Sequence, residues 1–425
     1  KIQILFAEQK QTAKADGKGY WEVNLKALEA GGPYQLQIIG KENQISIKDI
    51  LIGDVWLCSG QSNMQWVVNN VTNAEVEKKN ANYPQIRTLN IPRRMELSPK
   101  DTISATWLVC SPENVGRFSG VAYFFAKKVY EETNIPIGII NSSWGGTIVE
   151  TWTSLEAANT LPQKRLDRYN KNEKLFPPTE YLTRKNKEAK RNDYPSLVYN
   201  AMIHPLLSFS IKGVLWYQGE NNVGNAEPYT DWLTCMIGDW RNRWNSELPF
   251  YIIQLPNFDS INKKPLWAEM RDAQSKVLAV PGTHLIVTSD LGDPYDLHPR
   301  NKQEVGMRAA LQALHYEYGY SDIVSESPMF ERMEINGDKV IITFKNTGSG
   351  LEIRSRYGCL QGFAIAGEDK KFHWALGELK DNRIVIWSPK VPNPVAVRYN
   401  WENNPDGNLY NKDGLPACLF RTDNW

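Results

Sequence analysis

Ser62 is the side chain in this sequence that is best placed to act as a nucleophile. It follows an apolar run, Val55–Cys58, which is typical of a buried strand and which Ser59 and Gly60 terminate. The residues from 64 to 76 form a weakly amphipathic pattern that predicts a helix. A serine between a strand and a helix lies at the usual catalytic edge of an open α/β sheet, where the start of the helix favours negative charge. The segment by itself favours a helix-capping serine, and it lacks the Gly-x-Ser-x-Gly pattern of a nucleophile elbow.

A serine nucleophile needs a base, and His298 is the leading candidate among the five histidines. It lies in a loop that follows the strand-like run 283–288 and that contains Asp290, Asp293 and Asp296. A carboxylate that accepts from Nδ1 of the imidazole would fix its tautomer and stabilise the imidazolium ion. The other histidines suit packing positions or have no acidic loop beside them: His204, His284, His315 and His373.

The aspartates of this loop also provide oxygen atoms of the kind that bind calcium. Leu291 and Pro294 interrupt the series, however, and the glutamate that ends an EF-hand loop is missing. No metal site and no cofactor are therefore predicted.

Two further segments end strand-like runs with groups that could stabilise an oxyanion. The run that begins at Ile135 leads to Gly145 and Gly146, where a backbone N–H could approach a ligand closely. The run that begins at Gly213 leads to Gln218 and Asn221, whose side-chain amides could donate. A tight turn explains each glycine-containing loop alone. Four strand ends that carry Ser, Gly-Gly, Gln/Asn and Asp/His are harder to explain by packing.

These blocks are similar to those of the sialate O-acetylesterase family, a branch of the SGNH hydrolases. The resemblance begins with Gly-Gln-Ser-Asn-Met at 60–64 and covers nearly the whole chain. Its other blocks are Trp-Gly-Gly at 144–146, Trp-Tyr-Gln-Gly-Glu at 216–220, Asp-Trp-Arg-Asn-Arg-Trp at 239–244, and residues 298–306, 397–401, 408–411 and 414–417.

The resemblance implies a role for each matching residue. Ser62 would be the nucleophile, His298 the base, and Gly146 or Gly145 a backbone oxyanion donor. The remaining donor would be Gln218, although Gly219-Glu220-Asn221 also fits the Gly-x-Asn pattern of many SGNH enzymes, with Asn221 as the donor.

The acid of the triad departs from the usual Asp-x-x-His pattern. The position three residues before His298 is Tyr295, and Asp296 stands two residues before it. Asp296 or Asp293 could supply the carboxylate, or Ser62 and His298 could work as a dyad oriented by a backbone carbonyl.

The implied activity is the hydrolysis of O-acetyl groups from sialic acids. A sialic acid carboxylate would favour a bidentate arginine, for which Arg271 and Arg300 are candidates, whereas Arg241 equally suits a structural ion pair. One alternative is an acetylxylan or other polysaccharide O-acetylesterase that uses an aromatic platform. Another is a carbohydrate-binding protein on an inactive hydrolase scaffold. The family also implies a periplasmic or secreted location, and the expected partner is an O-acetylated sugar.

The periodicity of the chain indicates which elements position these residues. Residues 1–50 alternate polar and apolar and predict antiparallel strands, including 21–25 and 34–39. From 51 to 320 strands alternate with helices at 120–132, 229–244, 267–278 and 301–318, the pattern of a parallel sheet covered on both faces. Residues 157–192 form an expected insertion, and 321–425 return to β structure.

The fold implied is therefore α/β, with an SGNH-type, flavodoxin-like parallel sheet sandwiched by helices. Accessory β-rich regions, of jelly-roll or sandwich type, are expected at both chain ends, and the amino-terminal strands are expected to pair with the carboxyl-terminal ones.

Composition excludes several other classes of protein. A net charge of +1 over 425 residues provides no long-range field for nucleic acid, and no apolar run approaches the roughly 20 residues that span a bilayer. The five scattered cysteines predict neither a zinc site nor a disulfide framework. The 15 tryptophans suit the core and the faces of sugar rings.

Overall fold

A computed structural model of the chain describes residues 1–167, 194–259 and 264–425. Its centre is a seven-stranded sheet of order β11-β10-β9-β5-β8-β6-β7, in which β7 alone runs antiparallel to its neighbour. Most of the insertion expected at 157–192 lies outside the described residues. The strands of this sheet are β5 (Asp54–Gly60), β6 (Tyr83–Asn90), β7 (Trp107–Cys110), β8 (Ile137–Ser143), β9 (Gly213–Tyr217), β10 (Phe250–Ile253) and β11 (Thr283–Ile286).

The connections reverse direction at β5, which lies between β8 and β9 and pairs with both in parallel. A ligand site in such a sheet forms outside the carboxyl ends of the strands at this reversal. The position of β6 beyond β8, rather than beside β5, differs from a flavodoxin-type order. The α/β class itself, with a mostly parallel sheet between helices, is confirmed.

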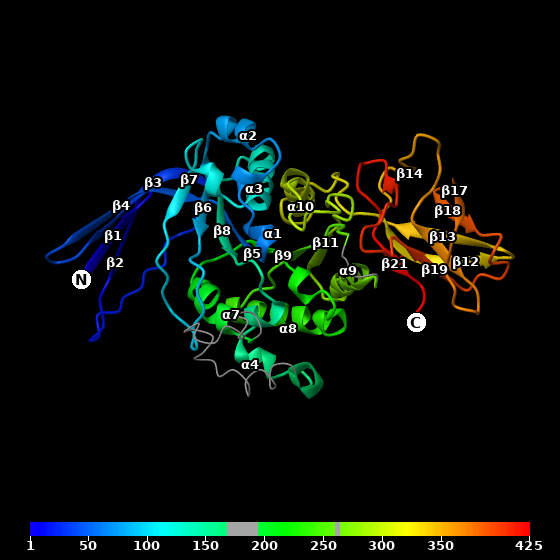
Figure 1. Ribbon diagram of the computed structural model, residues 1–425. Helices are drawn as coiled ribbons and strands as arrows, with labels where there is room; N and C mark the ends of the chain where they lie inside the picture. Colours follow the sequence, from blue (N-terminus) through cyan, green and yellow to red (C-terminus); the bar gives the residue numbers. More distant parts are fainter. Residues whose placement is uncertain (168–193, 260–263) are drawn as a thin grey trace.

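Helices cover both faces of the sheet (Figure 1). Side chains of β5 alternate between the two resulting cores: Trp56 and Cys58 face one, and Leu57 faces the other. All four long helices predicted from periodicity are present, with ends within a few residues of those expected. One face carries α2 (Ala74–Asn80), α3 (Gly120–Thr133) and α10 (Lys302–Glu317), and the other carries α7 (Leu197–Met202), α8 (Ala226–Trp244) and α9 (Leu266–Lys276).

The prediction of a helix over residues 64–76 is wrong. The helix that begins at Ser62 consists of one turn, α1 (Ser62–Gln65), because Val67 leaves the helical path to form a β-bridge with Ser119. A second short helix, α4 (Leu155–Ala158), lies on the opposite side of the sheet. Single 3₁₀ turns occupy Val68–Asn70, Val115–Arg117, Val149–Trp152, His204–Leu206, Glu220–Asn222 and Val277–Ala279.

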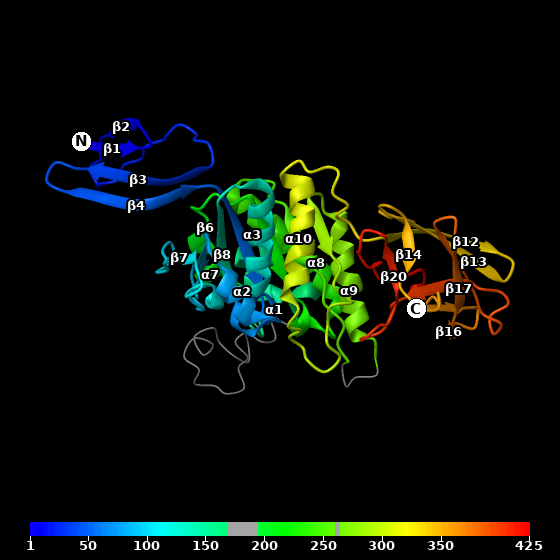
Figure 2. The same ribbon diagram turned by 90° about the horizontal axis from the view of Figure 1, so that it is seen from above.

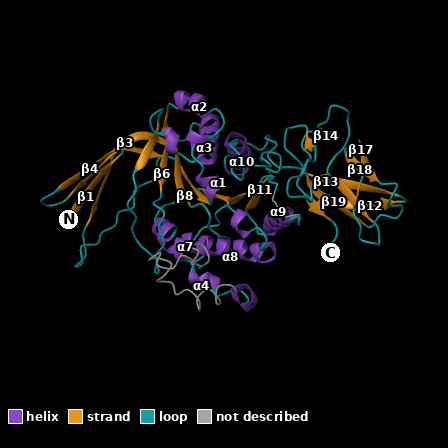
Figure 3. Ribbon diagram, in the orientation of Figure 1, coloured by secondary structure: helices purple, strands orange, loops and turns teal. Residues whose placement is uncertain are grey.

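The amino-terminal strands form a separate antiparallel sheet of order β2-β1-β3-β4. Residues 21–25, predicted as a strand, are irregular, and the expected pairing with carboxyl-terminal strands is wrong because the two β regions lie at opposite ends of the molecule (Figures 1 and 3). The four strands are β1 (Ile2–Phe6), β2 (Gln9–Ala13), β3 (Gly31–Ile39) and β4 (Gln44–Ile52).

The carboxyl-terminal region consists of three small antiparallel sheets around one apolar core. No helix among the described residues is long and apolar enough to cross a bilayer. The strands are β12 (Met329–Asn336), β13 (Lys339–Lys345), β14 (Leu351–Ile353), β15 (Phe363–Ala366), β16 (His373–Trp374), β17 (Leu376–Lys380), β18 (Arg383–Trp387), β19 (Ala396–Tyr399), β20 (Leu409–Asn411) and β21 (Phe420–Arg421).

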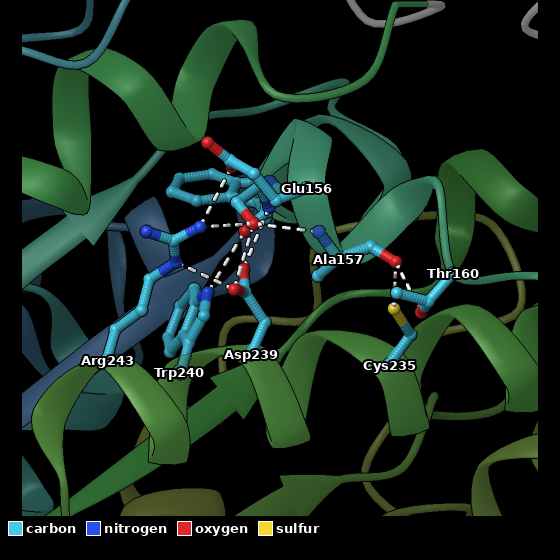
Figure 4. A network of polar contacts seen from close by, with 9 residues as sticks. Glu156, Ala157, Thr160, Cys235, Asp239, Trp240 and Arg243 are labelled. Atoms are coloured by element: carbon cyan, nitrogen blue, oxygen red, sulfur yellow. Dashed lines mark hydrogen bonds and ion pairs between the residues drawn. The ribbon is translucent and has the colours of Figure 1, made fainter.

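A buried polar cluster fixes α8 to the start of α4 (Figure 4). The carboxylate of Asp239 accepts from the backbone N–H and the hydroxyl of Ser154 at 2.9 and 2.8 Å, and from Nε of Arg243 at 2.7 Å. Arg243 also contacts Glu156, whose side chain is 74% exposed. The Asp-Trp-Arg-Asn-Arg-Trp block is thus explained by the packing of the fold.

Asp239→Ala is expected to destabilise the protein by about 3 kcal/mol, because it leaves the buried N–H of Ser154 unpaired and removes the buried carboxylate partner of Arg243. Urea unfolding measures this change. Glu156→Gln, which removes the exposed partner of the same arginine, is the matched control and should cost less than about 1 kcal/mol. Equal losses in the two variants would contradict this role of Asp239.

Candidate active site

Ser62 owes its position to the tight end of β5. Gly60 has a φ of 134°, and a Cβ there would lie 2.1 Å from the carbonyl oxygen of Tyr217. The same carbonyl accepts from the N–H of Gln61 at 2.9 Å. Only glycine permits this approach, so β5 and β9 end side by side and Ser62 begins α1 at the carboxyl edge of the sheet.

The structure brings together Ser62 and His298, which are 236 residues apart. Nε2 of His298 lies 2.8 Å from Oγ of Ser62, a normal hydrogen-bond distance. The indole of Trp66 stacks on the imidazole, with ring centroids 4.9 Å apart and planes 9° apart. The base is therefore held both by the serine and by an aromatic face that sequence reasoning did not identify.

Asp296 is the nearest aspartate of the acidic loop to the imidazole, but it is not a conventional third member of a triad. Its Oδ1 lies 4.0 Å from Nδ1 of His298 and accepts from the backbone N–H of that residue at 2.8 Å. Asp293 accepts from a backbone N–H within its own turn, and Asp290 forms a bidentate pair with Arg308 at 2.7 Å. The three aspartates thus face different partners.

The loops after β8 and β9 converge beside Ser62. A Cβ on Gly145 would lie 3.1 Å from that of Ser62, and the N–H of Gly145 donates to the side chain of Gln65 at 2.8 Å. Gly146 has a φ of 74°, and its carbonyl accepts from Nδ2 of Asn221 at 3.0 Å. Gln65 thus occupies the N–H of Gly145, one of the two predicted backbone donors.

Gln218, predicted as an oxyanion donor, has a fully buried side chain that is engaged with other groups of the protein. Nε2 lies within 3.1 Å of the side chain of Gln61, the carbonyl of Thr147 and the side chain of Asn222, and Oε1 accepts from the hydroxyl of Tyr229. The buried side chain of Gln218 therefore links the loops that follow β5, β8 and β9. The side-chain amide of Asn221, in contrast, lies at the surface of the site.

A buried polar network beneath the serine was not identified from the sequence. Asn63 donates through Nδ2 to Glu220 at 2.5 Å and to the carbonyl of Leu297 at 3.1 Å, and its Oδ1 accepts from Nζ of Lys302 at 2.5 Å. Asn63, the residue after Ser62, is thereby bonded to Leu297, the residue before His298. All of these positions lie in or beside the family blocks, but nothing in their spacing indicates which of them touch.

The network places a buried cation and a buried carboxyl close to the base. Burial lowers the pKa of Lys302 to about 7, opposed by Glu220 and Asp296, and burial raises the pKa of Glu220. Burial and then Lys302 lower the pKa of His298, whereas Asp296 raises it. The imidazole is therefore neutral near pH 7 and able to accept a proton from Ser62.

Two of the three arginines considered for a substrate carboxylate are engaged within the protein. Arg271 is fully buried and donates to backbone carbonyls, including that of Glu402, and burial lowers its pKa to about 9. Within residues 1–167, 194–259 and 264–425, no carboxylate forms an ion pair with Arg241, which donates to the carbonyls of Leu248 and Gly282. Arg300 is exposed, two residues after His298.

Three of the other histidines contact groups of the fold, as expected for His204 and His284. The ring of His284 stacks on that of Tyr251, and burial lowers its pKa to about 4. Nδ1 of His204 and of His315 each lies about 3 Å from a backbone carbonyl. His373 lies in β16, far along the chain in the carboxyl-terminal region.

Lys302→Met is expected to raise the pKa of His298, because Lys302 is still protonated in the pH range where the imidazole titrates and its positive charge opposes imidazolium. NMR titration of the five histidines measures this shift. Lys276→Met removes a lysine that is 57% exposed and paired with Asp272, and it should leave the pKa of His298 unchanged. An unchanged or lower pKa in Lys302→Met would contradict the electrostatic role of this lysine.

Comparison with known proteins agrees with this geometry. Residues 52–315 match the family described as carbohydrate esterase, sialic acid-specific acetylesterase. The sialate O-acetylesterase of Homo sapiens is 32% identical over 76% of this chain and 65% of its own length. That of Mus musculus is 31% identical over 93% of this chain and 82% of its own length.

A solved structure supports the same relationship. A carbohydrate acetylesterase from Xanthomonas citri is 39% identical and has a TM-score of 0.90, with 100% of this chain and 93% of that protein covered. The match to the human protein shows that this chain spans about 65% of the length of some curated relatives. The matched family region contains both Ser62 and His298, and the chain belongs to the sialic acid-specific acetylesterase family of carbohydrate esterases.

Proposed function

We propose that the protein is a serine esterase that removes O-acetyl groups from sugars. The observation that carries this proposal is the 2.8 Å contact between Oγ of Ser62 and Nε2 of His298 at the edge of the sheet where three loops converge. An SGNH-type site of this kind needs no cofactor, since the serine, the base and the backbone donors supply the chemistry.

In the first step, Oγ of Ser62 attacks the acetyl carbonyl while His298 takes the hydroxyl proton. The tetrahedral intermediate collapses when His298 returns that proton to the departing sugar oxygen, and acetyl-Ser62 remains. Water then attacks the acetyl-enzyme with the same imidazole as base, which releases acetate and restores Ser62.

The oxyanion would be stabilised by the N–H groups of Ser62 and Gly146 and by the side chain of Asn221. The convergence of the Gly146 and Asn221 loops supports this assignment. Asp296 would act through charge, since it favours the imidazolium ion without a hydrogen bond to Nδ1.

Among acetylated sugars, O-acetylated sialic acid is the first substrate that we propose, because the curated relatives are sialate O-acetylesterases. Arg300 is the remaining candidate to bind its carboxylate. A periplasmic or secreted location, which would give access to such glycans, stays a prediction from the resemblance.

The second candidate is a polysaccharide O-acetylesterase. The burial of Arg271 favours it, since this removes one expected carboxylate ligand. The relative from Xanthomonas citri, which is described as a carbohydrate acetylesterase, also supports a broader class of substrate.

Ser62→Ala is expected to lower kcat by at least about 10⁴-fold, because it removes the nucleophile. Acetate release from O-acetylated sialic acid and from acetylated xylan measures this loss and ranks the substrates. Ser59→Ala, a substitution of a buried serine on the same strand end, is the control and should retain activity. Turnover that survives Ser62→Ala would overturn the assignment, and preference for xylan would select the second candidate.

Asp296→Asn is expected to cost less than about 10²-fold in kcat, well below the roughly 10⁴-fold loss of a hydrogen-bonded triad aspartate. The acid limb of kcat/KM should move to lower pH, because the carboxylate that raises the pKa of His298 is gone. A pH profile of both proteins tests this. A loss as large as that of Ser62→Ala would show that Asp296 closes onto Nδ1 during the reaction.

Asn221→Ala is expected to lower kcat by about 10²–10³-fold with a smaller effect on KM, the signature of an oxyanion donor. Steady-state kinetics on the preferred substrate measures both constants. A pure rise in KM would assign Asn221 to substrate binding instead.

A further inference from the structure

The carboxyl-terminal region contains a pocket that the proposed reaction does not use. Its volume is about 600 Å³, and it opens beside the edge strand β16. We call it the aromatic pocket, and its principal lining residues are Phe372, His373, Trp374, Lys390, Trp401 and Glu402.

An exposed indole dominates the rim of this pocket. Trp374 is 61% exposed, and Leu376, which begins the next strand β17 and also lines the pocket, is 56% exposed. Exposed apolar surface rimmed by polar groups marks a binding site in a folded protein. A tryptophan face packs well against the C–H face of a pyranose ring, while the sugar hydroxyls bond to polar side chains at the edge.

The inner wall of the pocket is held rigid. The guanidinium of Arg398 lies 4.0 Å from the ring centroid of Phe372 and is fixed by two hydrogen bonds, 2.7 and 2.8 Å long, to Asp423. Arg421 stacks on Trp401 with its Cζ 4.8 Å from the ring centroid. Two rings of the pocket are therefore fixed before any ligand arrives, which lowers the entropic cost of binding.

The charged groups at the pocket carry both signs. The carboxylate of Asp423 pairs with both Arg398 and Arg421, and Lys390 and Glu402 contribute charges of opposite sign. A hydroxyl-rich, uncharged sugar suits this mixture, because its hydroxyl groups can both donate and accept hydrogen bonds.

The loop that lines the pocket is joined to the catalytic edge of the sheet. The carbonyl of Glu402 accepts from Arg271 on α9, and the side chain of Asn404 accepts from Asn257 at 2.7 Å. The side chain of Asn257 in turn accepts from the N–H of Gly292, in the loop that carries His298, at 2.6 Å. In Figure 2, α1 and β16 both lie toward the lower side of the view.

We propose that the aromatic pocket is a second, non-catalytic site that binds a neutral sugar unit of the glycan chain whose acetyl ester is cleaved at Ser62. This inference rests on the second candidate function, a polysaccharide O-acetylesterase, for the identity of the chain, and it implies a polymeric substrate rather than a free monosaccharide. Trp374 would provide the stacking platform, and the hydrogen-bonding groups around it would orient the ring.

Affinity electrophoresis of the full chain tests this proposal, in native gels that contain soluble xylan, β-glucan or galactomannan. Ser62→Ala serves as the parent protein, so that binding is measured without turnover. Adding Trp374→Ala is expected to weaken binding to the retarding polymer by about tenfold. Trp374→Phe should recover part of it, because the phenyl ring still stacks. Trp21→Ala, an exposed tryptophan of the amino-terminal region, should have no effect.

Absence of retardation by all three polymers, or equal retardation with and without Trp374→Ala, would overturn the proposal. The melting temperature of the Trp374→Ala variant checks that the fold is kept. Since the gel measures binding alone, it remains informative if no acetyl ester is hydrolysed. With Ser62 present, Trp374→Ala should reduce kcat/KM more on an acetylated polymer than on a small acetyl ester, and an equal reduction on both would also contradict the inference.

Discussion

The site depends on Asn63, which holds its two halves together. Its side-chain amide binds the carbonyl of Leu297 on the base loop while its own backbone follows Ser62 in α1. Glu220 and Lys302 complete its hydrogen bonds from two further elements. Since such contacts are strong in a buried, low-dielectric setting, they fix the distance between serine and imidazole. Loss of the Asn63 side chain would remove a hydrogen-bond partner from Glu220, Leu297 and Lys302 together.

Electrostatics supports the catalytic role that we propose for His298. Burial and Lys302 keep His298 neutral, which a general base requires, and Asp296 moderates that effect from 4.0 Å. The stacked Trp66 orients the ring in place of a carboxylate on Nδ1. The carboxyl-terminal region adds a separate element, since its loop around Glu402 packs on α9 and reaches the support of the base loop. Hydrogen bonds thus connect the loop that lines the aromatic pocket to the loop that carries His298.

Much of this arrangement was predictable from local pattern. The apolar run of β5 and the helical periods of α3, α8, α9 and α10 are strong signals, and Ser62 and His298 follow from residue type and family blocks. Prediction from the sequence failed where contacts between distant residues determine the local structure. The bridge from Val67 to Ser119 shortens α1, and the irregular 21–25 has no partner strand despite its alternation. The burial of Gln218 and the hydrogen bonds of Asn63 both depend on residues far away in the sequence, such as Gln61 for Gln218 and Lys302 for Asn63, so local pattern did not indicate them.

The central claim is that His298 activates Ser62 as a nucleophile. Reaction with a fluorophosphonate, followed by peptide mapping with mass spectrometry, tests it most directly, because this reagent forms a stable adduct only with an activated serine. The account predicts one adduct, on Ser62, whose formation slows by several orders of magnitude in His298→Ala. Labelling of another serine, or labelling of Ser62 at an unchanged rate without His298, would contradict it.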